Sequence, residues 1–171
     1  MNRIEFLDLL PEKGIGLELG VAKGDYSKAI CDNSKLSKIY GIDKYSDHHD
    51  DEEMINMLDL LKDHISSKRY TFLRGTFENY LEVFEDQSLD FIYIDGYAHN
   101  GQENGKTLSD WFCKLKPDGI FSGHDYHKKW PRTVNAVNEF VDKNNLKLNV
   151  VEDLEVDWDF PSWYVINDRA T

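Results

Sequence analysis

The sequence predicts a doubly wound α/β fold, with a mostly parallel sheet and helices on both of its faces. Three observations support this fold class. Short apolar runs alternate with amphipathic stretches along the chain, which is the pattern of successive βαβ units. The run Leu89–Asp95 is apolar almost to its end, as is typical of a strand covered on both faces. The last two expected strands have no helix between them, which predicts an antiparallel pair at the end of a seven-stranded sheet.

The expected strands are short runs of aliphatic and aromatic residues bounded by turn residues or charges. In chain order they are Gly14–Leu19, Lys38–Asp43, Tyr70–Leu73, Leu89–Asp95, Ile120–His124, Lys147–Val151 and Ser162–Ile166. The fifth strand is expected to follow a turn at Pro117-Asp118-Gly119. The acidic, aromatic segment Glu152–Phe160 before the last strand is interpreted as either a substrate-contacting lid or an oligomer contact.

The expected helices each carry an apolar stripe at helical spacing. They cover Asp25–Asp32, Asp50–Ile65, Phe77–Val83, Thr107–Leu115 and Arg132–Asn144. In the second helix, the stripe runs from Met54 to Ile65, and Pro131 stands where the first turn of the last helix tolerates proline. The acidic stretch Ser46–Glu53 is interpreted as complementing the dipole of the helix it precedes, with a metal or substrate role as the alternative.

Length, charge and hydropathy limit the classes of function that the chain can have. At 171 residues the chain is expected to form a single domain, 1–171, with residues 1–13 as an N-terminal helical lead-in. The 32 acidic and 20 basic residues give a formal charge of −12 without a basic stripe, so we expect a small-molecule substrate and no nucleic acid. No apolar run approaches the ~18 residues of a membrane span, and the acidic N-terminus does not resemble a signal peptide. We therefore expect a cytoplasmic protein with no membrane partner, in which Cys31 and Cys113 are reduced core thiols; whether it forms a homo-oligomer stays open.

A glycine-containing loop, Leu17 to Ser27, follows the first expected strand. In a doubly wound sheet, ligands bind beyond the carboxyl ends of the strands, and glycines there let the backbone approach the ligand. Gly14, Gly16 and Gly20 could be mistaken for a nicotinamide-cofactor loop, but such a loop must follow the strand that Gly14 and Gly16 open. The glycines placed to contact a ligand are therefore Gly20 and Gly24.

The spacing Glu18-x-Gly20-x-x-x-Gly24 resembles the cofactor loop of class I S-adenosylmethionine-dependent methyltransferases. The resemblance implies that Glu18 helps to hold the amino group of the methionine moiety and that the glycines pass beneath the cofactor. Asp43 ends the second strand and is placed to accept hydrogen bonds from both ribose hydroxyls. The expected cofactor-binding residues are Glu18, Gly20, Val21, Ala22, Gly24, Tyr26, Ser27, Asp43, Lys44, Gly75, Thr76, Asp95 and Gly96.

The second half of the chain carries a more specific resemblance. Its motifs Ile-Asp-Gly at 94–96, Leu-x-Pro-x-Gly at 115–119 and His-Asp-Tyr at 124–126 are similar to those of the type 24 methyltransferase domain. The likeness spans roughly residues 14–167. It implies a Rossmann-like methyltransferase fold with S-adenosyl-L-methionine as the cofactor.

Asp95 and the pair His124-Asp125 end two neighbouring parallel strands, so their side chains are expected to converge on one crevice. Related antibiotic-modifying O-methyltransferases bind Mg²⁺ through acids at these places. The resemblance therefore implies Asp95, His124 and Asp125 as ligands of a divalent metal, Mg²⁺ or Mn²⁺. Here a histidine replaces one oxygen ligand, and imidazole suits Mn²⁺, Zn²⁺ or Fe²⁺ better than Mg²⁺. The alternative is that the two aspartates only cap strand ends and orient the backbone.

Asp95, His99 and His124 are the expected catalytic residues. Some relatives carry a general-base acid two residues after the metal-binding aspartate, where Tyr97 stands in this chain. Histidine is the side chain that ordinarily titrates near neutrality, so His99 or His124 is expected to take the proton instead. We therefore expect O-methylation of a hydroxyl on a small molecule. The alternatives are N-methyl transfer, a cofactor-binding homologue that has lost turnover, and an NAD-dependent oxidoreductase.

Overall fold

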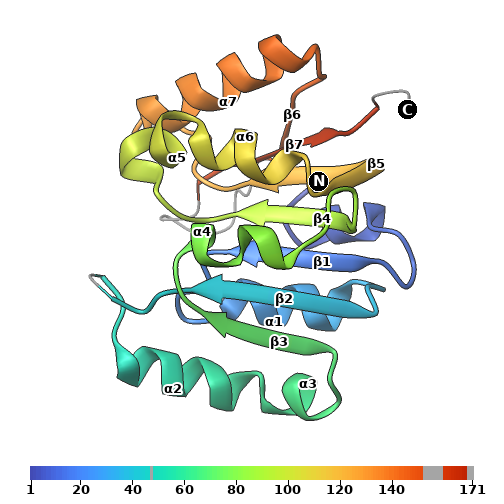
Figure 1. Ribbon diagram of the computed structural model, residues 1–171, viewed down its shortest axis with the longest axis vertical. Helices are drawn as coiled ribbons and strands as arrows, with labels where there is room; N and C mark the ends of the chain where they lie inside the picture. The colour runs from blue at the N-terminus through green and yellow to red at the C-terminus, as the bar shows by residue number, and fades with distance from the viewer. Residues whose placement is uncertain (47, 152–159, 169–171) are drawn as a thin grey trace.

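The computed structural model describes residues 1–46, 48–151 and 160–168, and these form a doubly wound sheet of seven strands (Figure 1). The strands are β1 Ile15–Leu19, β2 Lys38–Asp43, β3 Tyr70–Arg74, β4 Leu89–Ile94, β5 Leu115–Gly123, β6 Asn149–Val151 and β7 Ser162–Ile166. Their order in the sheet is β3-β2-β1-β4-β5-β7-β6. The first five are parallel, whereas β7 is antiparallel to both β5 and β6. The predicted fold class is therefore confirmed, including the antiparallel terminal pair.

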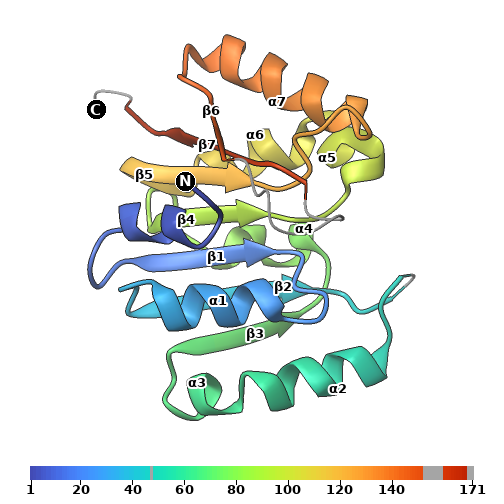
Figure 2. The same cartoon turned by 180° about the vertical axis from the view of Figure 1, so that it is seen from behind.

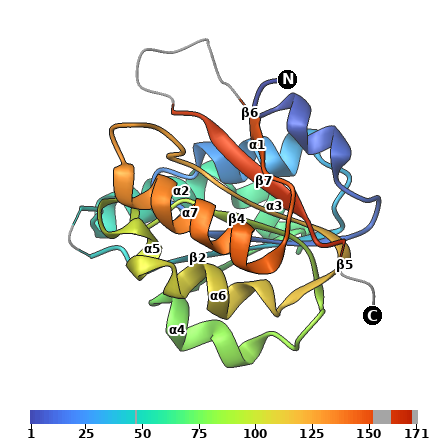
Figure 3. The same ribbon diagram turned by 90° about the horizontal axis from the view of Figure 1, so that it is seen from above.

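Helices cover both faces of this sheet. They are α1 Asp25–Asn33, α2 Asp51–Leu60, α3 Lys62–Ser66, α4 Phe77–Tyr80, α5 Gly101–Asn104, α6 Lys106–Phe112 and α7 Pro131–Asn144, with 3₁₀ turns η1 Glu5–Leu9, η2 Leu81–Val83 and η3 Ala98–Asn100. Figures 2 and 3 show α1 and the N-terminal turn on one face and α4, α6 and α7 on the other. A doubly wound sheet needs both layers, because each of its faces is apolar.

Strand β4 shows how the two faces are buried. Phe91 and Tyr93 point into the core beneath α1 and η1, while Ile92 and Ile94 point into the core beneath α6 and α7. All four side chains are at most 1 % exposed. Alternate residues of a strand point to opposite faces, so a run that is apolar at every position requires cover on both sides. The nearly continuous apolar pattern of this segment thus has its physical explanation.

Three local expectations were wrong. The helix expected over 50–65 is broken into α2 and α3 at Leu61, which is fully buried, as is Met57, whose side chain packs on Gly24. The turn expected at 117–119 lies inside β5, which begins at Leu115 and shifts register against β4. Cys113 follows α6 and is exposed, whereas Cys31 is buried as expected.

The strand order reverses between β1 and β4, and the segments that follow these two strands lie very close to each other. The Gly20 N–H donates to the Ile42 carbonyl at 2.9 Å, and the Asp95 N–H donates to the Leu19 carbonyl at 2.7 Å. Gly20 has a φ of +94°, and a Cβ on it would lie 2.1 Å from the carbonyl oxygen of Asp95. Only glycine fits at this crossing, for both conformational and steric reasons.

We expect Gly20→Ala to destabilise the fold more than Gly105→Ala. Both glycines have positive φ, but a Cβ on Gly105 would meet nothing closer than the Ala136 Cβ at 4.0 Å. Gly105→Ala should cost only the left-handed backbone strain, about 1–2 kcal/mol. Gly20→Ala should add the cost of displacing the loop after β4, about 1–3 kcal/mol more. Urea unfolding of the two variants measures the difference, and equal losses would contradict the close crossing.

Candidate functional site

A cleft of about 510 Å³ opens at the carboxyl ends of β1, β2, β4 and β5. This is the edge of the sheet beside the reversal of strand order, where open α/β sheets bind their ligands. Its walls come from the loops that follow these strands and from the segment after β3. The lining residues are Gly20, Ala22, Asp43, Lys44, Ser46, His48, His49, Gly75, Phe77, Asp95, Gly96, Tyr97, Ala98, His99, Asn100 and Asp125. Most of the site residues expected from the sequence thus share one cleft.

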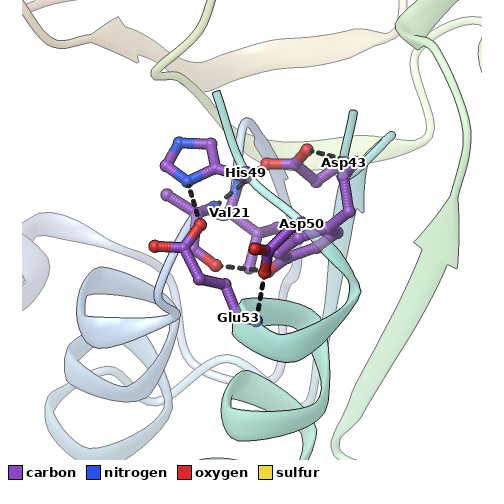
Figure 4. A network of polar contacts seen from close by, with 7 residues as sticks. Val21, Asp43, His49, Asp50 and Glu53 are labelled. Carbon is purple, nitrogen blue, oxygen red and sulfur yellow. Dashed lines mark hydrogen bonds and ion pairs between the residues drawn. The ribbon is translucent and has the colours of Figure 1, made fainter. Parts of the chain in front are cut away.

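Asp43 fixes the loop between β1 and α1 to the end of β2 (Figure 4). Its Oδ2 accepts hydrogen bonds from the amides of Val21 at 2.9 Å and Ala22 at 3.0 Å. Its Oδ1 accepts from the amide of Tyr45 at 3.0 Å, and the Tyr45 hydroxyl donates to the Ala22 carbonyl. Ala22 and Tyr45 both have positive φ, so these bonds hold two strained residues in place. Asp43 is therefore a structural anchor of the cleft wall.

This arrangement limits what Asp43 can do for a ligand. A carboxylate has about four acceptor positions, and three backbone N–H groups already use three of them. One position on Oδ1 is left for a hydroxyl that enters the cleft. The expectation that Asp43 accepts from both ribose hydroxyls therefore exceeds its remaining capacity in this geometry.

The loop between β2 and α2 brings two further histidines to the cleft. His48 and His49 both line it, and the His49 Nδ1 lies 2.8 Å from the Glu53 Oε2 (Figure 4). Asp50 caps α2 by accepting from the Glu53 amide at 3.0 Å, in agreement with the helix-terminal role expected for this acidic stretch. Asp47 lies outside the described residues. The histidines could have been found from the sequence, because their loop follows a strand that ends at the binding edge.

Glu18 lies beneath the cleft and does not line it. Its side chain is 1 % exposed, and it accepts a hydrogen bond from the Ser27 hydroxyl, which in turn lies 3.1 Å from the Tyr70 hydroxyl. Burial raises the pKa of Glu18 from an ordinary value of 4.5 to about 8, and the charge of nearby Asp95 adds to the rise, while the Ser27 hydrogen bond opposes it. Below about pH 8 this carboxyl therefore holds a proton.

Five other residues expected to touch a cofactor also lie away from the cleft lining, among them Val21, which is buried. Gly24 is buried against Met57, and the ring of Tyr26 packs on Tyr93 with centroids 4.4 Å apart. Ser27 is buried beside Glu18. Thr76 forms a capping box with Asn79 at the start of α4. Of the segment after β3, Gly75 and Phe77 are the residues that face the cleft.

Asp95, His124 and Asp125 converge as the strand ends predict, and the two aspartates line the cleft, whereas His124 contacts both of them without being among the lining residues. The His124 Nδ1 lies 3.5 Å from the Asp95 Oδ1 and 3.4 Å from the Asp125 Oδ1. One ligand atom from each residue falls within 4.8 Å of the others, the only such group of three metal-ligating side chains among the described residues. The His124 amide donates to the Ile94 carbonyl at 2.9 Å, so the sheet ladder fixes its backbone.

His99 stands at the outer wall of the same cleft. Its side chain is exposed, and its ring packs edge-on against Trp130 with centroids 4.5 Å apart. The ring of His48 approaches it from the opposite loop, at 6.1 Å between centroids. Tyr97, which replaces the acid of some relatives, has a φ of +59° and packs on Phe77. Burial raises the pKa of Tyr97, so it stays protonated and is no base at neutral pH.

The raised pKa of Glu18 predicts an unusual dependence of stability on pH. Between pH 4.5 and 8 the unfolded chain loses this proton while the folded chain keeps it, so stability falls as pH rises through this window. The slope approaches about 1.4 kcal/mol per pH unit at its steepest. We expect Glu18→Gln to remove this component, measured as the difference between wild-type and variant urea unfolding from pH 5 to 9. A difference that does not change with pH would contradict the buried, protonated carboxyl.

Comparison with known structures places the fold among methyltransferases. A precorrin-6y C5,15-methyltransferase from Geobacter metallireducens matches with a TM-score of 0.69 at 13 % identity, over 95 % of this chain and 84 % of that one. A putative methyltransferase from Streptococcus mutans, solved in complex with SAH, matches with a TM-score of 0.70 at 12 % identity, over 95 % and 94 %. An rRNA methylase from Streptococcus thermophilus matches with a TM-score of 0.67 at 14 % identity, over 95 % and 92 %. At these identities the likeness shows the fold alone.

Among the described residues, no helix has the length and apolar character that crossing a membrane requires.

No curated protein sequence matches the chain. A family model described as a methyltransferase domain, of type 24, matches residues 17–126. This match covers more than half of the chain and includes the loop after β1, the end of β2 and the cluster at Asp95 and His124. The chain therefore belongs to the type 24 family of class I S-adenosylmethionine-dependent methyltransferase domains.

Proposed function

We propose that this chain transfers the methyl group of S-adenosylmethionine to a hydroxyl of a small-molecule acceptor. One observation carries the proposal: the loops expected to hold the cofactor open into the same cleft as Asp95 and Asp125, the two carboxylates that flank His124. Its volume of about 510 Å³ lies within the range of about 300–1,000 Å³ that small-molecule sites occupy.

The cofactor half of the cleft lies over the ends of β1, β2 and β3. Gly20 and Gly96 present backbone without side chains, Asp43 offers its remaining acceptor position, and Phe77 offers a ring face. We assign the ribose to Asp43 and the adenine to Gly75 and Phe77, because a carboxylate suits hydroxyls and a ring suits a base. Glu18 acts here from below, by shaping the loop through Ser27.

The acceptor half lies at the ends of β4 and β5. The cofactor supplies a methyl group already activated on a sulfonium, so the protein has to align the acceptor and manage its proton. His124 stands between two carboxylates that can orient its ring and stabilise its charged form. We assign it the general-base role for a hydroxyl bound beside Asp95. His99, at the exposed wall, is the second candidate for the base.

Asp95, His124 and Asp125 could instead hold a divalent metal ion. Mg²⁺ or Mn²⁺ with bonds of about 2.1 Å holds adjacent ligand atoms about 3 Å apart. The 3.4 and 3.5 Å separations at His124 fit such a site after a small contraction. Two carboxylates and one imidazole suit Mn²⁺ better than Mg²⁺. If a metal binds here, it would polarise the acceptor hydroxyl, and His99 would remain to take the proton.

The net negative charge of the chain favours a small-molecule acceptor over a nucleic acid. The chain carries a formal charge of −12, which opposes binding to a phosphate backbone. One of the similar structures is an rRNA methylase, so RNA is the alternative acceptor. N-methyl transfer remains a variant of the same proposal, since it would use the same cleft and alignment.

Cofactor binding is tested by thermal shift with S-adenosylhomocysteine and, separately, with NADH. At about 100 times its dissociation constant, the first should stabilise the wild type by about 2.7 kcal/mol, and NADH should have no effect. Asp43→Asn, which weakens the hold on three backbone amides, should lower the affinity at least about tenfold. Asp51→Asn is the matched control, because its exposed carboxylate contacts Arg74 outside the cleft. Stabilisation by NADH but not S-adenosylhomocysteine would favour an oxidoreductase.

The reaction is tested with Asp95→Ala and His124→Ala on a panel of phenols and sugars, by following S-adenosylhomocysteine formation. We expect each variant to bind cofactor and to lose at least about 100-fold in turnover, the usual contribution of a positioned base. Glu139→Gln, on the exposed face of α7, is the control. Restoration of wild-type turnover by Mn²⁺ after removal of metals with EDTA would separate the metal role from the base role. Full activity in both alanine variants would overturn the site assignment.

A further inference from the structure

Two histidine rings face each other in the cleft, from loops on either side of β1. The centroids of His48 and His99 lie 6.1 Å apart, with an interplanar angle of 40°. His48 follows β2 and His99 follows β4, and these two strands flank β1 in the sheet (Figure 1). Both histidines line the cleft, as does Gly20 directly after β1. We call His48 and His99 the histidine pair; it connects the two sides of the cleft beyond the end of β1.

The histidine pair differs from the other four histidines of the chain in its polar contacts. Among the residues that the structure describes, neither ring of the pair makes a hydrogen bond or an ion pair, and both side chains are exposed. Each of the other four has a polar partner: His49 has Glu53, His64 has Asp32, His124 has Asp95 and Asp125, and His127 has the amide of Lys129. The two rings that face each other are thus the two whose nitrogens are unused.

The separation of the two rings fits a shared metal ion after a small movement. A tetrahedral ion binds imidazole nitrogens at about 2.0–2.1 Å, which places the centres of two such rings about 5 Å apart. The observed 6.1 Å therefore requires an approach of about 1 Å. Exposed side chains change rotamer within nanoseconds, so rotation of the two rings can supply this approach.

The chemistry of the histidine pair selects the kind of metal. Imidazole suits Zn²⁺, Ni²⁺ and Cu²⁺, whereas Mg²⁺ prefers oxygen ligands. Within the described parts of the chain, no third histidine, cysteine or acid joins the pair in a group with ligand atoms within 4.8 Å of one another. A tetrahedral ion on the pair therefore keeps about two positions for water or for a donor atom of a ligand in the cleft. This distinguishes the pair from the cluster at Asp95, where two carboxylates offer oxygen.

We propose that the histidine pair binds a divalent ion of the zinc class, which links the loop after β2 to the segment after β4 and closes the cleft over its ligand. The ion holds the two loops together across the end of β1, so a ligand against Gly20 and Asp95 leaves less readily. A metal-bound imidazole has no lone pair left for a proton, so the bridged state leaves the base role to His124. The metal site does not depend on the proposed function; only its effect on cofactor binding does.

The site is tested by titrating Zn²⁺ into the metal-free full chain by calorimetry. Asp95→Asn is introduced in every sample, so that the carboxylate cluster does not compete for the ion. We expect His48→Gln and His99→Gln each to weaken zinc binding at least about tenfold, because even the loss of a group that supports a ligand costs about 10–100-fold. The two losses should not add in the double variant, since both residues hold the same ion. Mg²⁺ should not compete.

His49→Gln is the matched control. His49 lies in the same loop and also lines the cleft, but its Nδ1 contacts Glu53 (Figure 4). This substitution should leave the zinc affinity unchanged. Equal zinc affinities in the parent and in both variants of the pair would overturn the metal site. Additive losses would overturn it as well, because they would mean that the two histidines bind separate ions.

Closure of the cleft is tested by titrating S-adenosylhomocysteine with and without saturating Zn²⁺. We expect zinc to tighten its binding at least about fivefold, the lower end of the usual coupling between two sites, and S-adenosylhomocysteine to tighten zinc by the same factor. His99→Gln should abolish this coupling. Independent binding of the two would overturn the closure. If S-adenosylhomocysteine does not bind at all, the proposed function fails, while the zinc titration still decides the metal site.

Discussion

The cleft depends first on the bonds between Asp43 and the loop that follows β1. Three backbone N–H groups from two loops converge on one carboxylate, two of them from consecutive residues. Charge-assisted hydrogen bonds of this kind are about twice as strong as neutral ones. They hold Ala22 and Tyr45 in left-handed conformations that those side chains would otherwise avoid. The cofactor wall is thus a product of an acid placed at the end of the neighbouring strand, and the glycines only make room for it.

The strand pattern was predictable because it rests on burial alone. Apolar runs at Lys38–Asp43 and Ser162–Ile166 mark strands whose bounds agree with the structure, and their alternation with helices fixes the topology. The break between α2 and α3 and the irregularity in β5 were not predictable in the same way. The end of α2 at Leu60 leaves the apolar spacing intact, and the bulge at Asp118 uses residues that equally suit a turn. Local sequence does not distinguish a turn from an irregular strand when both need the same backbone angles.

The candidate site was predictable where a strand end alone sets position, as at Asp95 and His124. It was less predictable where the side chain has a choice of direction. Glu18 ends β1 as expected, yet alternation in the strand turns it beneath the loop toward Ser27. His48 and His49 were assigned to a helix terminus, although their loop also forms a wall of the cleft. A position on the correct edge of a sheet is therefore weaker information than the direction in which its side chain points.

Three acids line this cleft and a fourth, Glu18, lies beneath it, and the four are accommodated in three ways. Glu18 holds its proton, Asp43 is satisfied by amides, and Asp95 and Asp125 share His124 between them. Like charges this close would otherwise raise one another's pKa values. Glu18 is left neutral and Asp43 keeps a single acceptor position, whereas Asp95 and Asp125 leave negative charge facing the cavity. A centre of this sign favours a ligand that carries positive charge, and the sulfonium of S-adenosylmethionine carries it while its demethylated product does not. The arrangement of acids thus favours the charged reactant over the neutral product at the place where the methyl group is to leave.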